Sequence, residues 1–124
     1  MKIRISGNSI RFRLKQSEVK QFKEQGEIRE TICFGREAAD QLSFVLKAVP
    51  SDSFDLSFQS NNIVVQVPQS TGDEWTNTEL VGFEEMVDTG RGEQINILVE
   101  KDFKCLDGND IEDADAYPNP NMHC

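Results

Sequence analysis

The fold is decided by residues 1–48, which read MKIRISGNSIRFRLKQSEVKQFKEQGEIRETICFGREAADQLSFVLKA. When the sequence is shifted by 53 positions, the apolar positions of this stretch coincide with apolar positions of residues 54–101, and no gap is needed. Phe22 meets Trp75, and Gln41-Leu42-Ser43-Phe44 meets Gln94-Ile95-Asn96-Ile97. Because a common offset held through three loops is hard to obtain by chance, the sequence predicts that residues 54–101 repeat residues 2–48.

Each copy is predicted to have the order β-β-α-β-β. Residues 2–6 and 10–15 alternate between apolar and charged side chains, which is the period of a half-buried strand, around a Gly7-Asn8-Ser9 turn. Ser17 is a candidate helix N-cap, and Gly26 can end that helix in the left-handed conformation. Two further strands are expected at residues 28–34 and 41–48.

The second copy shows the same order of signals. Thr71 and Glu74 have the spacing of a capping box, which predicts a second short helix carrying Trp75. Its four strands are expected at residues 54–60, 63–67, 80–87 and 94–100. The acidic, proline-containing segment 102–124 lies outside the repeat and is expected to cover the surface as far as Tyr117.

These patterns predict a single domain, residues 1–124, of the α+β class with mainly antiparallel strands. The two units would form an eight-stranded barrel or a two-sheet sandwich with two short helices, related by a pseudo-twofold axis. Phe22 and Trp75 should be buried. A common core face should be formed by Ile3, Ile5, Ile10, Phe12 and Leu14.

Composition restricts the classes of function. A chain of 124 residues with 37% hydrophobic and 28% charged residues fits one ordinary domain, and no apolar run is long enough to span a membrane. The start Met1-Lys2-Ile3-Arg4 lacks the apolar segment of a secretory signal, and the three cysteines are an odd number for a disulfide framework. We therefore expect a cytoplasmic protein without a membrane partner. The net charge of −9 disfavours general nucleic-acid binding.

The charge is unevenly distributed. Residues 1–25 contain seven cations and two glutamates, a net charge of +5, so the remaining residues carry −14. Five of these cations fall on one face of the predicted first hairpin: Lys2, Arg4, Arg11, Arg13 and Lys15. Such a face can simply be solvated and protect a sheet edge, can receive the acidic C-terminal segment, or can bind an anion. The second copy replaces these cations with Asp55, Ser57, Val64, Gln66 and Pro68, so the fold of the repeat does not require them.

A second constellation is formed by Cys105, His123 and Cys124. Thiolate and imidazole groups suit zinc, but the usual paired spacing is absent, and adjacent ligands are awkward to direct at one ion. Incidental residues at a frayed terminus are the alternative, and no cofactor is predicted. Cys33 is interpreted as a small sheet residue, and no phosphate loop or catalytic triad is present in the sequence.

Three motifs carry a family resemblance: Lys-Ile-Arg-Ile-Ser-Gly-Asn-Ser-Ile-Arg-Phe-Arg-Leu at residues 2–14, Glu-Lys-Asp-Phe-Lys-Cys-Leu at 100–106 and Asp-Ala-Tyr-Pro-Asn-Pro at 115–120. With them the chain resembles a family of small, uncharacterised bacterial proteins classed as a domain of unknown function. The resemblance implies a bacterial origin and carries no established activity. From the residues we expect a non-catalytic binding or interaction protein with an unknown protein or an anionic small molecule as partner. The alternative is an enzyme or binder acting on an anionic small molecule, for example a phosphorylated one, through the basic hairpin.

Overall fold

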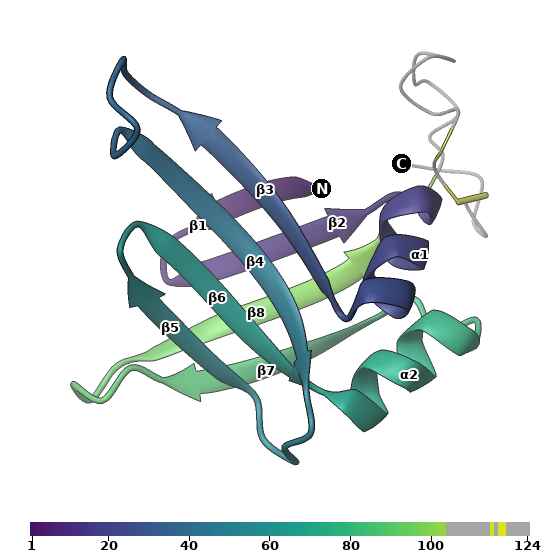
Figure 1. Ribbon diagram of the computed structural model, residues 1–124. Coiled ribbons are helices and arrows are strands. Elements are labelled where there is room, and N and C mark those ends of the chain that lie inside the picture. The colour runs from purple at the N-terminus through teal and green to yellow at the C-terminus, as the bar shows by residue number, and fades with distance from the viewer. Residues whose placement is uncertain (104–114, 116, 119–124) are drawn as a thin grey trace. The chain divides into compact units, whose positions relative to one another are not determined.

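The computed structural model describes residues 1–103, 115, 117 and 118 and divides the chain into two compact units (Figure 1). The first unit combines residues 1–20 with residues 80–124, and the second unit is residues 21–79. Each unit contains one four-stranded sheet with two antiparallel pairs and one parallel pair of strands. The expected α+β class with two helices is confirmed. The expected barrel is wrong, because the described strands form two separate sheets and neither closes on itself.

The sheet of the first unit has the strand order β1-β2-β8-β7. Its strands are β1 (Lys2–Ser6), β2 (Ser9–Leu14), β7 (Gly82–Asp88) and β8 (Gln94–Lys101). Strands β1 and β2 form one hairpin and β7 and β8 another, and the two hairpins join through the parallel pair β2 and β8. The sheet therefore takes one hairpin from each predicted copy.

The sheet of the second unit has the order β3-β4-β6-β5. Its strands are β3 (Glu27–Cys33), β4 (Gln41–Val49), β5 (Asp55–Gln59) and β6 (Asn62–Pro68). Again two hairpins meet in a parallel pair, here β4 and β6. The β5–β6 turn holds Ser60 and Asn61 at positive φ, one residue before the expected Asn61-Asn62 turn.

The parallel pairs of the two sheets have related registers. In the first sheet Ser9 lies opposite Asn96, and in the second Asn62 lies opposite Ser43. Asn62 is 53 positions after Ser9, and Asn96 is 53 positions after Ser43. The gapless offset does not extend to every strand, because β7 begins at Gly82, 55 positions after the first residue of β3. The loop that follows β7 is correspondingly shorter than the loop after β3.

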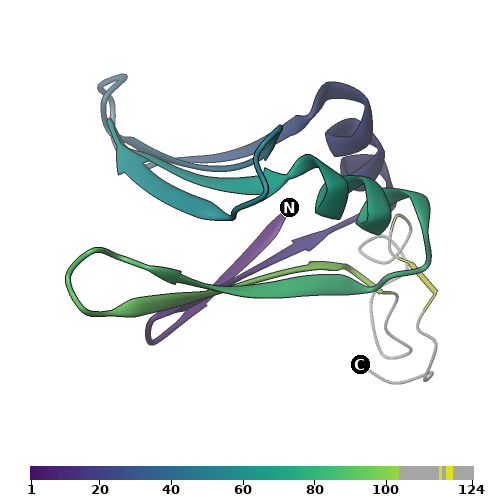
Figure 2. The same ribbon diagram turned by 90° about the horizontal axis from the view of Figure 1, so that it is seen from below.

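The helices are α1 (Gln16–Gln25) and α2 (Gln69–Asn77), and both Figures 1 and 2 show them side by side. The Phe22 and Trp75 rings make an edge-to-face contact, with centroids 5.9 Å apart and an interplanar angle of 70°. Both side chains are buried, at 3% and 0% exposure. Close packing extends to Gly72, where a Cβ atom would lie 3.2 Å from the Phe22 ring. The two aromatic residues thus hold the helices together, as expected for side chains of this size.

Both expected N-terminal helix caps are wrong, whereas Gly26 follows the last residue of α1 at a positive φ of 74°, as expected. Helix α1 begins at Gln16, so Ser17 lies inside its first turn, and helix α2 begins after Pro68 without a side-chain cap bond. Instead, the Lys15 N–H donates to Glu18 Oε1 at 2.9 Å, and the Ser17 N–H donates to Asp115 Oδ1 at 3.1 Å. Asp115, a residue far along the chain, supplies the acceptor that a local N-cap side chain usually provides.

The apolar face of the first sheet is only partly as expected. Ile10, Phe12 and Leu14 are buried, with Ile97 and Val99 from β8 beside them. Ile5 is 63% exposed, against the expectation that it belongs to the core. Its strand, β1, is an edge strand with a neighbour on one side only, so fewer side chains are available to cover it.

Candidate anion-binding site

The candidate site lies on the first sheet, on the face opposite Ile10 and Phe12. In the β1–β2 hairpin Lys2 lies opposite Arg13, and Arg4 lies opposite Arg11. Residues directly opposite each other in a sheet share a face, so these four cations project to the same side. Lys15 follows the end of β2, and its backbone N–H is bonded to Glu18. The hairpin register therefore brings together four of the five cations singled out in the sequence.

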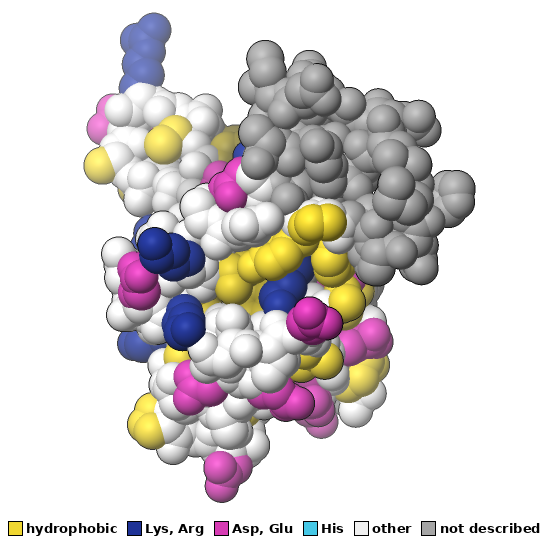
Figure 3. Space-filling model, turned by 90° about the vertical axis from the view of Figure 1, so that its right-hand side faces the viewer, with side chains coloured by type: hydrophobic (Ala, Val, Ile, Leu, Met, Phe, Trp, Pro, Cys, Tyr) yellow, Lys and Arg dark blue, Asp and Glu magenta, His cyan; other side chains and the backbone are white. Residues whose placement is uncertain are grey.

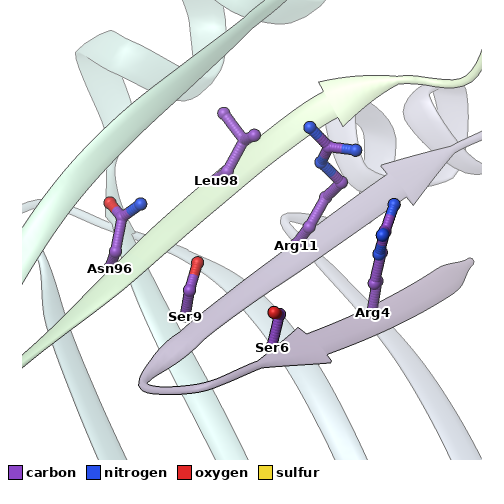
Figure 4. Close-up of a pocket in the computed structure, with 6 residues that line it drawn as sticks. All are labelled: Arg4, Ser6, Ser9, Arg11, Asn96 and Leu98. Atoms are coloured by element: carbon purple, nitrogen blue, oxygen red, sulfur yellow. The ribbon is translucent and has the colours of Figure 1, made fainter.

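A cavity of about 330 Å³ lies on this face (Figure 4). It is lined by Arg4, Ser6, Ser9, Arg11, Asn96 and Leu98. Figure 4 shows all six side chains projecting to the same side of the sheet, from β1, β2 and β8. The cavity thus has cationic, hydroxyl, amide and aliphatic groups within one small volume.

The lining residues form two rows across three strands. One row, called the charged row for its two arginines, consists of Arg4, Arg11 and Leu98, and each residue is the register partner of the next. The other row, called the neutral row, consists of Ser6, Ser9 and Asn96, which are also successive register partners. Neighbouring strands are about 4.7–4.9 Å apart, and alternate residues along a strand are about 6.5–7 Å apart. One end of the cavity is therefore suited to negative charge and the other to neutral hydrogen-bonding groups.

A second, smaller cavity of about 190 Å³ adjoins this face and is lined by Lys2, Ile3, Arg4, Arg11 and Arg13. It shares Arg4 and Arg11 with the first cavity. The two arginines are therefore accessible from both cavities.

Internal carboxylates neutralise part of the basic face. Glu100 Oε1 lies 3.3 Å from Arg11 Nε and 3.0 Å from Arg13 Nε, and Asp102 Oδ2 lies 3.2 Å from Lys2 Nζ. Within the described part of the chain, no carboxylate forms an ion pair with Arg4. Arg4 is therefore the cation of the face whose charge is least compensated.

The amide of Asn96 is the second polar feature of the cavity. Asn96 Oδ1 is buried without a hydrogen-bond partner among the described residues. Buried amide oxygens are nearly always hydrogen-bonded, so an orphaned one calls for a partner that is not part of the described chain. The backbone N–H of Asn96 is bonded to Asn8 O at 3.0 Å, which fixes the residue in the strand.

The described residues of the C-terminal segment contact the same unit. The Tyr117 N–H donates to Asp102 O at 2.7 Å, and its ring packs edge-to-face on Phe103 with centroids 5.9 Å apart. Lys101 Nζ lies 5.3 Å from the centre of the Tyr117 ring. Burial, and secondarily the charge of Asp115, raises the pKa of Tyr117 above its ordinary value of 10.0. The segment is thus anchored beyond β8, beside the acidic group that pairs with Lys2.

Charges on the surface are mixed: Figure 3 shows basic side chains close to acidic ones on one face of the molecule. The pairing of Glu100 with Arg11 and Arg13 is an example of this mixing on the first sheet. The hypothesis that the acidic segment packs near the basic hairpin concerns Asp107, Asp110, Glu112, Asp113 and Asp115. Of these only Asp115 is described, and it accepts a hydrogen bond from the Ser17 N–H in α1, so the hypothesis stays a prediction.

The candidate metal ligands Cys105, His123 and Cys124 also lie outside the described residues, so that site stays a prediction. Within the part of the chain that the structure describes, no group of three or more His, Cys, Asp and Glu side chains is placed to hold a metal ion. Cys33 is the last residue of β3, which agrees with its interpretation as a sheet residue, and its free thiol is exposed.

Sequence reasoning missed four lining residues and Glu100. Ser6 and Ser9 could have been found, because strand alternation places them on the same side as Arg4 and Arg11. Asn96, Leu98 and Glu100 could not, because their position depends on the parallel pairing of β2 with β8. A parallel pair between strands so far apart in the chain leaves no local signal.

Comparison with known proteins assigns the family. The family of unknown function DUF7009 matches residues 1–121. The chain belongs to this family. No curated protein and no solved structure matches the chain. In the described part of this DUF7009 member, no helix has both the length and the apolar character needed to cross a membrane.

Proposed function

We propose that this DUF7009 protein is a non-catalytic binding protein whose ligand carries an anionic oxygen group held between Arg4 and Arg11. The observation that carries the proposal is the cavity that Arg4 and Arg11 line from directly opposite positions on neighbouring strands. Like charges in this position repel and destabilise a sheet. An anion bound between them would remove that repulsion.

The chemistry of the two arginines suits such a ligand. A guanidinium group presents several N–H donors in a planar fork that matches phosphate and carboxylate oxygens. Arg11 uses Nε toward Glu100, so the terminal nitrogens of its fork are left for another acceptor. Arg4 has no ion-pair partner among the described residues. A bound anion would therefore gain charge-assisted hydrogen bonds from both sides.

The composition of the cavity favours binding over catalysis. Its described lining has two arginines, two serines, an asparagine and a leucine. None of these residue types commonly serves as a general acid or base, and an activated serine needs a neighbouring base. The alternative of an enzyme acting through the same cations therefore has less support.

Calorimetric titration with inorganic phosphate tests the proposal. We expect saturable binding at low ionic strength, lost or weakened at least about tenfold in Arg4→Gln and in Arg11→Gln, because each removes one of two charge-assisted contacts. Arg36→Gln is the matched control: it removes an arginine charge from an exposed loop of the second unit. Equal binding by all three variants, or no binding by the unaltered protein, would refute the proposal.

We also propose that the chain arose by internal duplication of residues 2–48 as residues 54–101. The shared offset of 53 in both parallel registers supports this, and so does the equivalent strand order of the two sheets. The positions equivalent to Arg4 and Arg11 are Ser57 and Val64. On this account the anion site is a feature that only one copy carries.

We propose the bacterial cytoplasm as the site of action. The exposed free thiol of Cys33 suits a reducing compartment, where thiols are kept from forming disulfides. An acidic chain with a net charge of −9 is not expected to bind nucleic acid in general, so the partner is proposed to be a small anionic molecule.

A further inference from the structure

We infer that the ligand of the cavity is a phosphate ester of a hydroxyl-bearing small molecule, of the sugar or polyol phosphate class. This inference rests on the proposed function and adds the nature of the group attached to the anion. It starts from the neutral row of Ser6, Ser9 and Asn96, which a simple inorganic anion would leave unused.

The geometry sets the distance between the two kinds of group. The charged row and the neutral row are separated by two residues along each strand, or about 6.5–7 Å. A phosphate between Arg4 and Arg11 is too small to reach the Asn96 amide as well. A ligand that carries hydroxyl groups one sugar ring away from its phosphate spans both rows.

The polar groups of the neutral row match hydroxyl groups in particular. Serine hydroxyls and an asparagine amide both donate and accept hydrogen bonds, as sugar hydroxyls do. The buried Oδ1 atom of Asn96 lacks a donor among the described residues, and its amide makes no described side-chain contact that would prevent rotation toward the cavity. The dianionic phosphate group of an ester offers only acceptors, whereas a hydroxyl elsewhere in the same ligand can supply the missing donor.

Glu100 determines the direction in which the ligand extends. Its carboxylate lies beside Arg11 and Arg13, where it would repel a second anion. The phosphate is therefore confined to the space between Arg4 and Arg11. The uncharged body of the ligand then extends away from Glu100, over Ser9 and Asn96. A volume of about 330 Å³ is at the lower end of the range for small-molecule sites and suits a ligand of this size.

Calorimetry with four probes tests the inference: inorganic phosphate, glycerol 3-phosphate, ribose 5-phosphate and glucose 6-phosphate. We expect at least one ester to bind about tenfold more tightly than inorganic phosphate, since its hydroxyls add hydrogen bonds to the neutral row. The double variant Ser6→Ala/Ser9→Ala should lose most of this preference while its affinity for inorganic phosphate is unchanged. That unchanged affinity also shows that the variant is folded.

Controls separate this inference from the proposed function. Ser51→Ala/Ser53→Ala removes two exposed serines from the β4–β5 loop and should keep the preference. If inorganic phosphate binds in an Arg4-dependent way but no ester binds more tightly, the inference fails while the anion site stands. If an ester is preferred but the Ser6→Ala/Ser9→Ala variant keeps that preference, the inference also fails. If no probe binds at all, the proposed function fails with it.

Discussion

Glu100 is the residue that most affects the availability of the arginines to a ligand. Its Oε1 atom lies between Arg11 Nε and Arg13 Nε, at 3.3 and 3.0 Å, and its side chain is only 18% exposed. A carboxylate in this position holds the Arg11 side chain but also lowers the positive potential of the cavity. The two effects have opposite consequences for anion affinity. If glutamine replaces Glu100, its neutral amide can preserve the contact with the arginine, so the loss of the negative charge should dominate.

Replacement Glu100→Gln tests this balance. The amide oxygen can still accept the hydrogen bond from Arg13 Nε, while one negative charge next to the site is removed. Charge interactions near a protein surface are worth about 0.2–1 kcal/mol, so phosphate affinity should rise about 1.4- to fivefold at low salt. The same change at Glu93, an exposed residue of the β7–β8 loop, should leave affinity unchanged in parallel titrations. A weaker affinity in Glu100→Gln would mean that Glu100 acts chiefly by orienting Arg11.

At the scale of elements, hydrophobic periodicity predicted the strands well and the helix ends poorly. Alternation in residues 2–6 and 10–15 locates β1 and β2 to within one residue, because each residue's environment follows from the pleat. The start of α1 was missed because part of its capping comes from Asp115, nearly a hundred positions away. Capping rules describe local acceptors, so they cannot identify one supplied from a distant part of the chain.

The contact between the two helices makes a quantitative prediction. Phe22→Ala removes a ring that is 3% exposed and packs on Trp75, so it should lower the free energy of unfolding by about 3–5 kcal/mol in urea denaturation. Phe58→Ala, which truncates a ring that is 65% exposed in the same unit, is the matched control and should change it by less than about 1 kcal/mol. Similar losses in both variants would contradict a core role for Phe22.

At the scale of the whole molecule, each sheet combines a hairpin from residues 2–48 with a hairpin from residues 54–101. The order of elements along the chain could be predicted from the offset of 53, since each copy has its own strand and turn signals. The prediction of a barrel was wrong because the alternation of side chains shows which face of a strand is buried but does not show which strand is its neighbour. The two parallel pairs, which determine both sheets and place Asn96 in the candidate site, therefore required the structure.

Because each sheet needs one hairpin from each copy, a fragment that contains only one copy should not fold alone. Residues 1–52 expressed alone contain two hairpins whose parallel partners, β8 and β6, are missing. We expect this fragment to lack a cooperative thermal transition as a monomer, followed by circular dichroism, and to regain one when mixed with residues 53–124. A fragment that melts cooperatively as a monomer in size-exclusion chromatography would show that one copy is a complete folding unit.

The anion site between Arg4 and Arg11 is tested most directly by two-dimensional ¹H–¹⁵N NMR during titration with inorganic phosphate. If the site is as proposed, the largest saturable shifts belong to backbone amides of β1, β2 and β8 around the cavity, with Arg4, Arg11 and Leu98 among them. The same titration of Arg4→Gln should leave these signals in place. Shifts that are confined to the second unit, or that persist unchanged in Arg4→Gln, would contradict the account.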